Sequence, residues 1–181
     1  MSEQRSLYVN IKIGKERLEQ FFQSKPTKAI VDENWLAWWN SREMYSPQPL
    51  TEIYTYPSAT NRIIGNGYFE IPELVAGEDL SQDGIWIFSV LMLSENFEEI
   101  LPTLSWLKSI AAYMAPEDEG TAIIYDHFWG DKDVMAHLEF KDQQGVLKLT
   151  KHCSELDPAL LEKADATLTA AYEKFSANYN D

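Results

Sequence analysis

The stretch Ile85-Trp86-Ile87-Phe88-Ser89-Val90-Leu91-Met92-Leu93 decides the fold. Eight of these nine residues are apolar, several are β-branched or aromatic, and the run is too short to cross a bilayer. A strand that is apolar on both faces must be covered on both faces. We therefore predict that Ile85–Leu93 is the central strand of a sheet and that the other elements lie beside it or over it.

Hydrophobic periodicity predicts the secondary structure of the rest of the chain. Alternation with a period of two predicts strands, and apolar residues three or four positions apart predict helices. Within 62–71, Gly65-Asn66-Gly67 is expected to form either a hairpin turn or a bulge. Strands are predicted over 7–13, 50–56, 62–71, 121–129, 134–140 and 146–150, and helices over 15–24, 32–44, 95–114 and 158–177.

This order, β-α-α-β-β-β-α-β-β-β-α, predicts an α+β fold with a single mixed or mostly antiparallel sheet and helices mainly on one face. A chain of 181 residues is expected to form a single domain. The acidic segment 73–84 is interpreted as a linker between two βαββ-like halves. Whether the halves arose by duplication stays open.

The net charge of −14 is unevenly distributed. Residues 1–72 hold eight bases and eight acids, whereas residues 73–181 hold seven bases and 21 acids. Such a surface repels nucleic acid and anionic lipid and steers a basic partner, so we expect neither a nucleic-acid nor a membrane partner. Solubility alone is the alternative explanation.

The number of cysteines and the length of the apolar runs indicate the cellular compartment of the protein. A single cysteine, Cys153, excludes an internal disulfide and favours a reducing environment. The first residues carry no apolar signal-peptide core, and no apolar run reaches about 18 residues. We expect a soluble, cytoplasmic protein.

The candidate binding residues are acids in turns and in the linker, with two aromatic residues nearby as anchors. Such positions can reach a partner without disturbing the sheet. They are Glu78, Asp79, Asp83, Glu117, Asp118, Glu119, Asp131 and Asp133, with Phe128 and Trp129 as the anchors.

Tryptophans at 35, 38 and 39 share one face of a predicted helix. Their size favours a packing role over a stacking surface for a ligand, so at least two should be buried.

An alternative site is an acid–base pair. A four-residue loop over 130–133 would place Asp126 directly opposite His137 on neighbouring strands, where a carboxylate raises the pKa of an imidazole. Pairs of this kind are also common scaffolding. His127, on the apolar face, is expected to be a hydrogen-bonded core residue. His152 and Cys153 are adjacent and chelate poorly, so we predict no metal and no cofactor.

In general organisation the chain resembles the immunity proteins of bacterial polymorphic toxin systems. The similar features are the small acidic α+β form, the tryptophans at 35–39, and Ala112-Tyr113-Met114-Ala115-Pro116 leading through Gly120 into Ile123-Ile124-Tyr125-Asp126-His127. The resemblance implies a non-catalytic protein that binds and neutralises a cognate toxin, and no site residue is carried over from it.

Three functions follow as hypotheses. The first is a non-catalytic acidic module that binds a basic protein, for example a toxin domain. The second is an enzyme or small-molecule binder that uses the Asp126/His137 region or the Trp35–Trp39 helix. The third is a subunit of a homo-oligomer. The sequence does not decide the oligomeric state.

Overall fold

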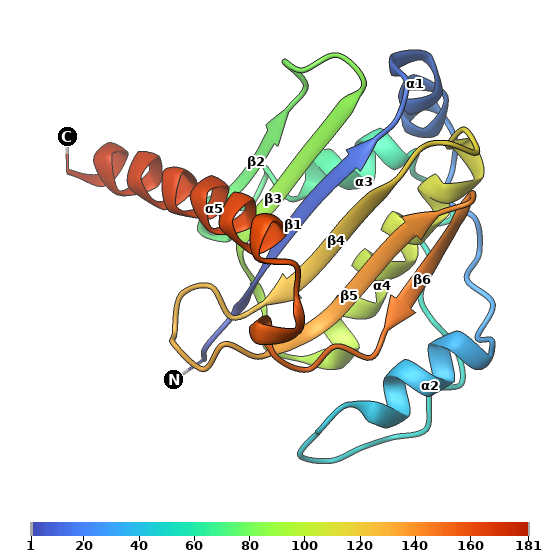
Figure 1. The fold of residues 1–181 in the computed structure, drawn as a ribbon, viewed down its shortest axis with the longest axis horizontal. Coiled ribbons are helices and arrows are strands. Elements are labelled where there is room, and N and C mark those ends of the chain that lie inside the picture. The colour runs from blue at the N-terminus through green and yellow to red at the C-terminus, as the bar shows by residue number, and fades with distance from the viewer. Residues whose placement is uncertain (1, 181) are drawn as a thin grey trace.

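The strands of this computed structural model, which describes residues 2–180, form one antiparallel sheet in the order β2-β3-β1-β4-β5-β6 (Figure 1). The α+β class and the mostly antiparallel single sheet are therefore confirmed. The strands are β1 (Arg5–Lys12), β2 (Ala76–Asp79), β3 (Ile85–Ser94), β4 (Gly120–Tyr125), β5 (Val134–Lys141) and β6 (Gln144–Lys148).

The apolar strand β3 lies inside the sheet, as predicted. It pairs with β1 on one side and with β2 on the other. Trp86, Phe88 and Val90 point into the main core, and Leu91 points to the opposite face. β1 itself lies between β3 and β4, so the N-terminal strand completes the centre of the sheet.

Buried side chains of the first four helices share one core with one face of the sheet, and Figure 1 shows the fifth helix crossing the other face. This arrangement confirms that the helices lie mainly on one face. The helices are α1 (Lys15–Gln23), α2 (Glu33–Ser41), α3 (Asn61–Gly67), α4 (Phe97–Lys108) and α5 (Pro158–Tyr179), with short 3-10 turns at Pro72–Leu74, Ser109–Tyr113 and Cys153–Glu155.

The main core between the sheet and the first four helices is rich in tryptophan. Trp35, Trp38 and Trp39 of α2 are all buried, which confirms their packing role. The Trp38 indole N–H donates to the Met135 carbonyl (3.1 Å), and that of Trp39 donates to the Gln48 carbonyl (2.7 Å). Burial of these polar atoms is thus compensated.

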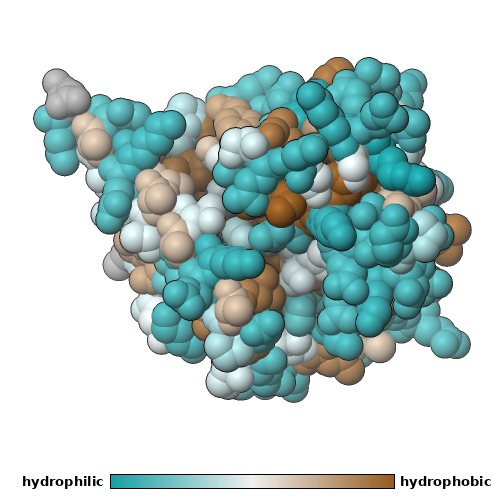
Figure 2. All heavy atoms as spheres, turned by 45° about the horizontal axis from the view of Figure 1, so that its top comes forward, coloured by the Kyte–Doolittle hydropathy of each residue, from teal (hydrophilic) through white to brown (hydrophobic). Residues whose placement is uncertain are grey.

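Helix α5 covers only part of the second face and extends past the edge of the sheet (Figure 1). Ala164 and Leu168 are its buried residues, and they pack against Tyr8, Leu91 and Ile123. The face shown in Figure 2 is largely hydrophilic, with hydrophobic side chains in smaller patches. An antiparallel sheet commonly leaves one face partly solvated in this way.

Two segments predicted as strands are not strands. Residues 50–56 have no regular structure, and the segment 62–71 contains α3 instead. The Thr60 hydroxyl accepts from the Ile63 N–H at the start of this helix. A Cβ at Gly65 would lie 3.2 Å from the Trp106 ring, so this glycine permits close packing of a helix and does not mark a hairpin turn.

The segment 73–84, which was predicted to be a linker, contains a strand. Ala76–Asp79 forms the edge strand β2, which pairs with β3, and its Glu78 side chain accepts from Arg62 and from the Trp86 indole N–H. Only one strand comes from the first 75 residues, so the comparison of two βαββ halves loses its N-terminal strand pair. Of the helix predicted over 95–114, α4 ends at Lys108 and a 3-10 turn follows.

None of the helices within residues 2–180 combines the length and hydrophobicity that crossing a bilayer requires.

Candidate interaction groove

Several chain segments meet at one end of the sheet. Arg5 at the start of β1 pairs with Ser94 at the end of β3, where α4 begins. The Glu3 N–H donates to the Glu95 carboxylate (3.0 Å). Residues 43–46, which follow α2, form the opposite wall. The space between these segments is open.

This space is a hollow of about 770 Å³, within the usual size range of binding sites. Its wall comes mainly from 43–46 and 92–99. Among the lining residues that the structure describes, none is lysine or arginine, and five carry carboxylates: Glu43, Glu73, Glu95, Glu98 and Glu99.

The local sequence explains why acids gather there. The Asn96 side chain accepts from the Glu98 N–H (2.8 Å) and caps α4, and Ser94 donates to the Glu99 carboxylate (2.5 Å). Carboxylates in a first helical turn are stabilised by the positive end of the helix dipole. Glu43, Glu73 and Glu98 are exposed, and within residues 2–180 no base pairs with them.

A second hollow of about 470 Å³ adjoins the first and is mostly apolar. It lies between α3, α4 and the residues after α3. Tyr68 lies in its wall, where its hydroxyl bonds the Thr103 hydroxyl (2.5 Å) and burial raises its pKa to about 12. The two hollows share Leu74, Leu93, Ser94 and Glu99, so they form one continuous groove.

A third hollow of about 310 Å³ continues from the acidic one through Glu43, Glu95 and Phe97. It contains both signs of charge, including Arg5 and Arg42. We call the three hollows together the groove.

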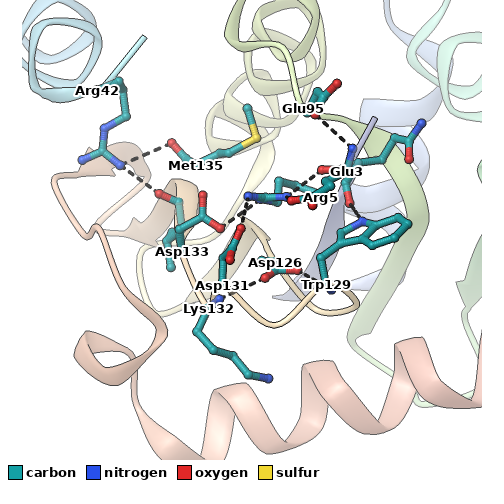
Figure 3. Close-up of polar contacts among 12 residues, drawn as sticks. Glu3, Arg5, Arg42, Glu95, Asp126, Trp129, Asp131, Lys132, Asp133 and Met135 are labelled. Atoms are coloured by element: carbon teal, nitrogen blue, oxygen red, sulfur yellow. Dashed lines mark hydrogen bonds and ion pairs between the residues drawn. The ribbon is translucent and has the colours of Figure 1, made fainter. Parts of the chain in front are cut away.

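The buried Arg42 lies at the end of α2 beside the third hollow (Figure 3). Its guanidinium donates to carbonyls of Val134 (3.0 Å), Thr150 (2.8 Å) and Leu149 (3.0 Å). Burial lowers its pKa, and the charge of Glu155 partly opposes this. Arg42 therefore holds α2 against the start of β5 and the chain after β6.

The loop 126–133 borders the same end of the sheet (Figure 3). Buried Asp126 accepts from the N–H groups of Trp129 (2.7 Å) and Lys132 (3.0 Å). Burial alone would raise the pKa of Asp126, but these hydrogen bonds and the charge of Arg5 together lower it. Arg5 also lies 2.9 Å from the carboxylate of Asp133 and 3.5 Å from that of Asp131.

Comparison with protein-family models, curated proteins and solved structures finds no match to this chain. The interpretation of the groove therefore rests on its geometry and charge.

Most of the predicted binding acids fall at two opposite ends of the sheet, and Glu78 lies between the ends on the edge strand β2. The carbonyls of Gly84 and Glu119 accept from Ile13 and Lys12, so the acids near them lie beside the end of β1. Asp131 and Asp133 lie beside its start, at Arg5. Seven residue steps of about 3.3 Å each place the two ends roughly 23 Å apart. The structure does not bring these acids together on one small surface.

Several of these residues already have partners within the chain. Glu78 pairs with Arg62 (3.0 Å), and the carboxylate of buried Asp118 accepts from the Ala115 N–H (2.8 Å). The Trp129 indole N–H donates to the Gln4 carbonyl (3.0 Å), and Phe128 packs on Tyr172. The other four are exposed: Asp79, Asp83, Glu117 and Glu119. The Asp79 carboxylate accepts from the Ser81 N–H.

The predicted Asp126/His137 pair does not form. β4 ends at Tyr125, a register shift occurs between Ile124 and Tyr125, and His137 lies opposite Ile123. The connecting loop spans 126–133, twice the length assumed. His137 bonds the Thr150 hydroxyl (2.8 Å), and burial lowers its pKa.

His127 lies under α5, where it bonds the Asp165 carboxylate (2.8 Å), which also accepts from the Tyr125 hydroxyl (2.6 Å). His127 is thus hydrogen-bonded, as predicted. Cys153 is buried, and burial raises the pKa of its thiol to about 11, so it is a poor nucleophile at neutral pH. Within residues 2–180, no cluster of three His, Cys, Asp or Glu side chains could hold a metal ion.

Sequence reasoning missed the glutamates of the groove. The segment Ser94-Glu95-Asn96-Phe97-Glu98-Glu99 carried the signal, because three acids surround a helix cap without a base. Glu43 belongs to the charge-balanced half of the chain, and only folding brings it to the same hollow.

Proposed function

We propose that this protein is a non-catalytic binding protein that holds a basic protein partner in the groove. The observation that carries the proposal is the hollow of about 770 Å³ whose described lining has five glutamates and no base. Unpaired carboxylates around one concavity focus a negative field, which attracts a basic surface and repels nucleic acid or anionic lipid.

The resemblance to immunity proteins supplies a specific form of this proposal. The partner would then be a basic toxin domain, and binding would block the toxin. The excess of acids over bases in residues 73–181 supports this form. A cytoplasmic location belongs to the same proposal, and the single buried cysteine is compatible with a reducing compartment.

The geometry also determines which residues should be changed to test it. Charge reversal of Asp118, Asp131 or Asp133 would disturb a turn or the Arg5 contacts as well as the field. Glu43 and Glu73 lie in the groove outside the α-helices and have no ion-pair partner among the described residues. The matched control is Glu162→Lys with Glu173→Lys, because both residues are exposed on α5.

The experiment captures a partner from a lysate of the producing cells, identifies it by mass, and measures its association rate against salt concentration. The expected partner is basic, and its association slows as salt rises, because screening acts over roughly 8–10 Å at 0.1–0.15 M. Glu43→Lys with Glu73→Lys should slow association at least about ten-fold at low salt, and the control variant should not.

Three results would overturn the proposal. Equal rates for the groove variant and the control would remove the groove as the binding surface. Recovery of only small molecules would favour a ligand-binding protein, and recovery of only copies of this chain would favour a homo-oligomer.

A further inference from the structure

The apolar hollow beside α3 leaves large hydrophobic side chains in contact with water. Tyr56, Ile63 and Ile71 line it and are 41%, 58% and 52% exposed. Tyr54 and Phe69, from the same part of the chain, are 62% and 45% exposed. Soluble proteins rarely gather exposed apolar groups in one concave place unless something binds there.

Residues of α3 and α4 form part of the two walls of this hollow. Helix α3 buries Ile64 against the core but turns Ile63 outward. Pro102 of α4, which lacks an N–H, forms part of the opposite wall. An outward isoleucine beside an open hollow stays in water until another molecule covers it.

Charge narrows the choice of occupant. The two acids of the apolar hollow are Glu70 and Glu99, and no base is found among its described lining residues. Glu99 also belongs to the acidic hollow, so an occupant of one hollow lies beside the carboxylates of the other. Anionic lipid is therefore repelled, and an apolar occupant that also carries positive charge is favoured.

We infer that the apolar hollow receives the apolar face of a basic, amphipathic segment of a protein partner, whose lysine or arginine side chains lie against the adjoining acidic hollow. This inference rests on the proposed function and specifies the partner's binding element. The buried apolar contacts set how long the complex lasts, and the charges set how fast it forms.

Two double variants separate the apolar contribution from general surface hydrophobicity. Ile63→Ser with Ile71→Ser removes apolar groups from the hollow. Leu80→Ser with Leu149→Ser is the matched control, because these leucines are 52% and 51% exposed and lie outside the hollow. All four side chains are at least half exposed, so both variants should remain folded, which circular dichroism checks.

The probe is a peptide selected on the wild-type protein from a random display library, with peptides of about 15 residues, or four helical turns. The selected peptides are synthesised, and their affinity is measured by fluorescence anisotropy. We expect enrichment of sequences that carry both basic residues and apolar residues three or four positions apart. Ile63→Ser with Ile71→Ser should weaken binding at least about ten-fold, and the control less than about two-fold.

Failure of this inference is distinguishable from failure of the proposed function. No enrichment, or enrichment of acidic or purely charged peptides, overturns the inference. If Glu43→Lys with Glu73→Lys weakens binding of the captured partner but Ile63→Ser with Ile71→Ser leaves it unchanged, the acidic groove stands and the apolar anchor fails. If neither variant weakens binding, both proposals fail.

Discussion

At the scale of single residues, Asp126 is the clearest case of a buried charge that organises a loop. Its two carboxylate oxygens accept from different N–H groups, those of Trp129 and Lys132. Lys132 has a left-handed φ of 59°, which a lysine adopts only when its surroundings enforce it. The carboxylate therefore fixes the conformation that places Asp131 and Asp133 near Arg5.

Asp126→Ala should lower the free energy of unfolding by about 2–4 kcal/mol, because two N–H groups lose a charged acceptor. The matched control is Asp131→Asn, since Asp131 is exposed and 3.5 Å from Arg5. Urea unfolding at pH 7 measures both variants. Equal, small losses would contradict the role of Asp126.

The same residue predicts a pH dependence. The pKa of Asp126 is lowered from its ordinary value of 3.8, so the folded state binds this proton less tightly than the unfolded state does. Its contribution to stability is fully present above pH 3.8 and is lost as the pH falls through the lower, folded pKa. Asp126→Asn should therefore have a flatter stability profile below pH 4 than the wild type, and an unchanged profile would contradict this.

Arg42 is a second buried charged residue whose substitution should lower the stability of the fold. Arg42→Lys keeps the charge but replaces the planar guanidinium, which reaches carbonyls on two sides, with a single ammonium group. We expect a loss of about 2–3 kcal/mol in the free energy of unfolding. Arg17→Lys on α1, whose side chain is exposed, is the control and should change stability by less than about 0.5 kcal/mol.

At the scale of elements, the edge strand β6 is protected by a side chain. The Asn34 amide donates to the Leu147 carbonyl and accepts from the Leu147 N–H, both at 2.9 Å, as a neighbouring strand would. Edge strands without such cover tend to pair with other chains. The opposite edge, β2, is only four residues long and carries two acids.

Asn34→Ala should lower the free energy of unfolding by about 1–3 kcal/mol, because both main-chain groups of Leu147 lose their partner. It should also make the apparent mass depend on concentration in light scattering, because β6 is then free to pair. Asn40→Ala, in the exposed part of the same helix, is the control. Equal stability of the two variants would refute the protective role.

The elements also show how far the sequence predicts this structure. The segments 85–93 and 158–177 were predicted correctly because the first is apolar almost throughout and the second carries apolar residues at helical spacing along its length. The helix Asn61–Gly67 was missed because its glycines read as a turn, and only the Trp106 ring explains Gly65. The Asp126/His137 pair failed because one register shift and a longer loop moved every opposing residue.

At the scale of the whole molecule, the acidic excess does not form one surface. The acids near Gly84 and Glu119 lie at the opposite end of the sheet from Arg5 and the groove, and some of the acids are neutralised within the chain. Composition alone led to the proposal of a basic partner. The groove could not be predicted, because residues from distant parts of the chain meet there only after folding.

Clustering acids without basic partners in the groove should lower the stability of the folded protein. Glu43→Lys with Glu73→Lys places two bases beside Glu95, Glu98 and Glu99, and the net charge changes from −14 to −10, since each reversal adds two. Each new pair should contribute about 0.2–1 kcal/mol at low salt. We expect this variant to unfold at a higher urea concentration than the wild type in about 0.01 M salt, with the gain fading near 1 M, where the screening length falls to about 3 Å.

Glu162→Lys with Glu173→Lys makes the same change in net charge at exposed positions of α5 outside the groove, and should stabilise the fold less than the groove variant does. A groove variant that is more stable yet binds its partner more slowly would show that these acids are retained for binding at the expense of stability. If its stability is unchanged at every salt concentration, the glutamates do not share a common field, and the groove does not attract a basic partner by its charge.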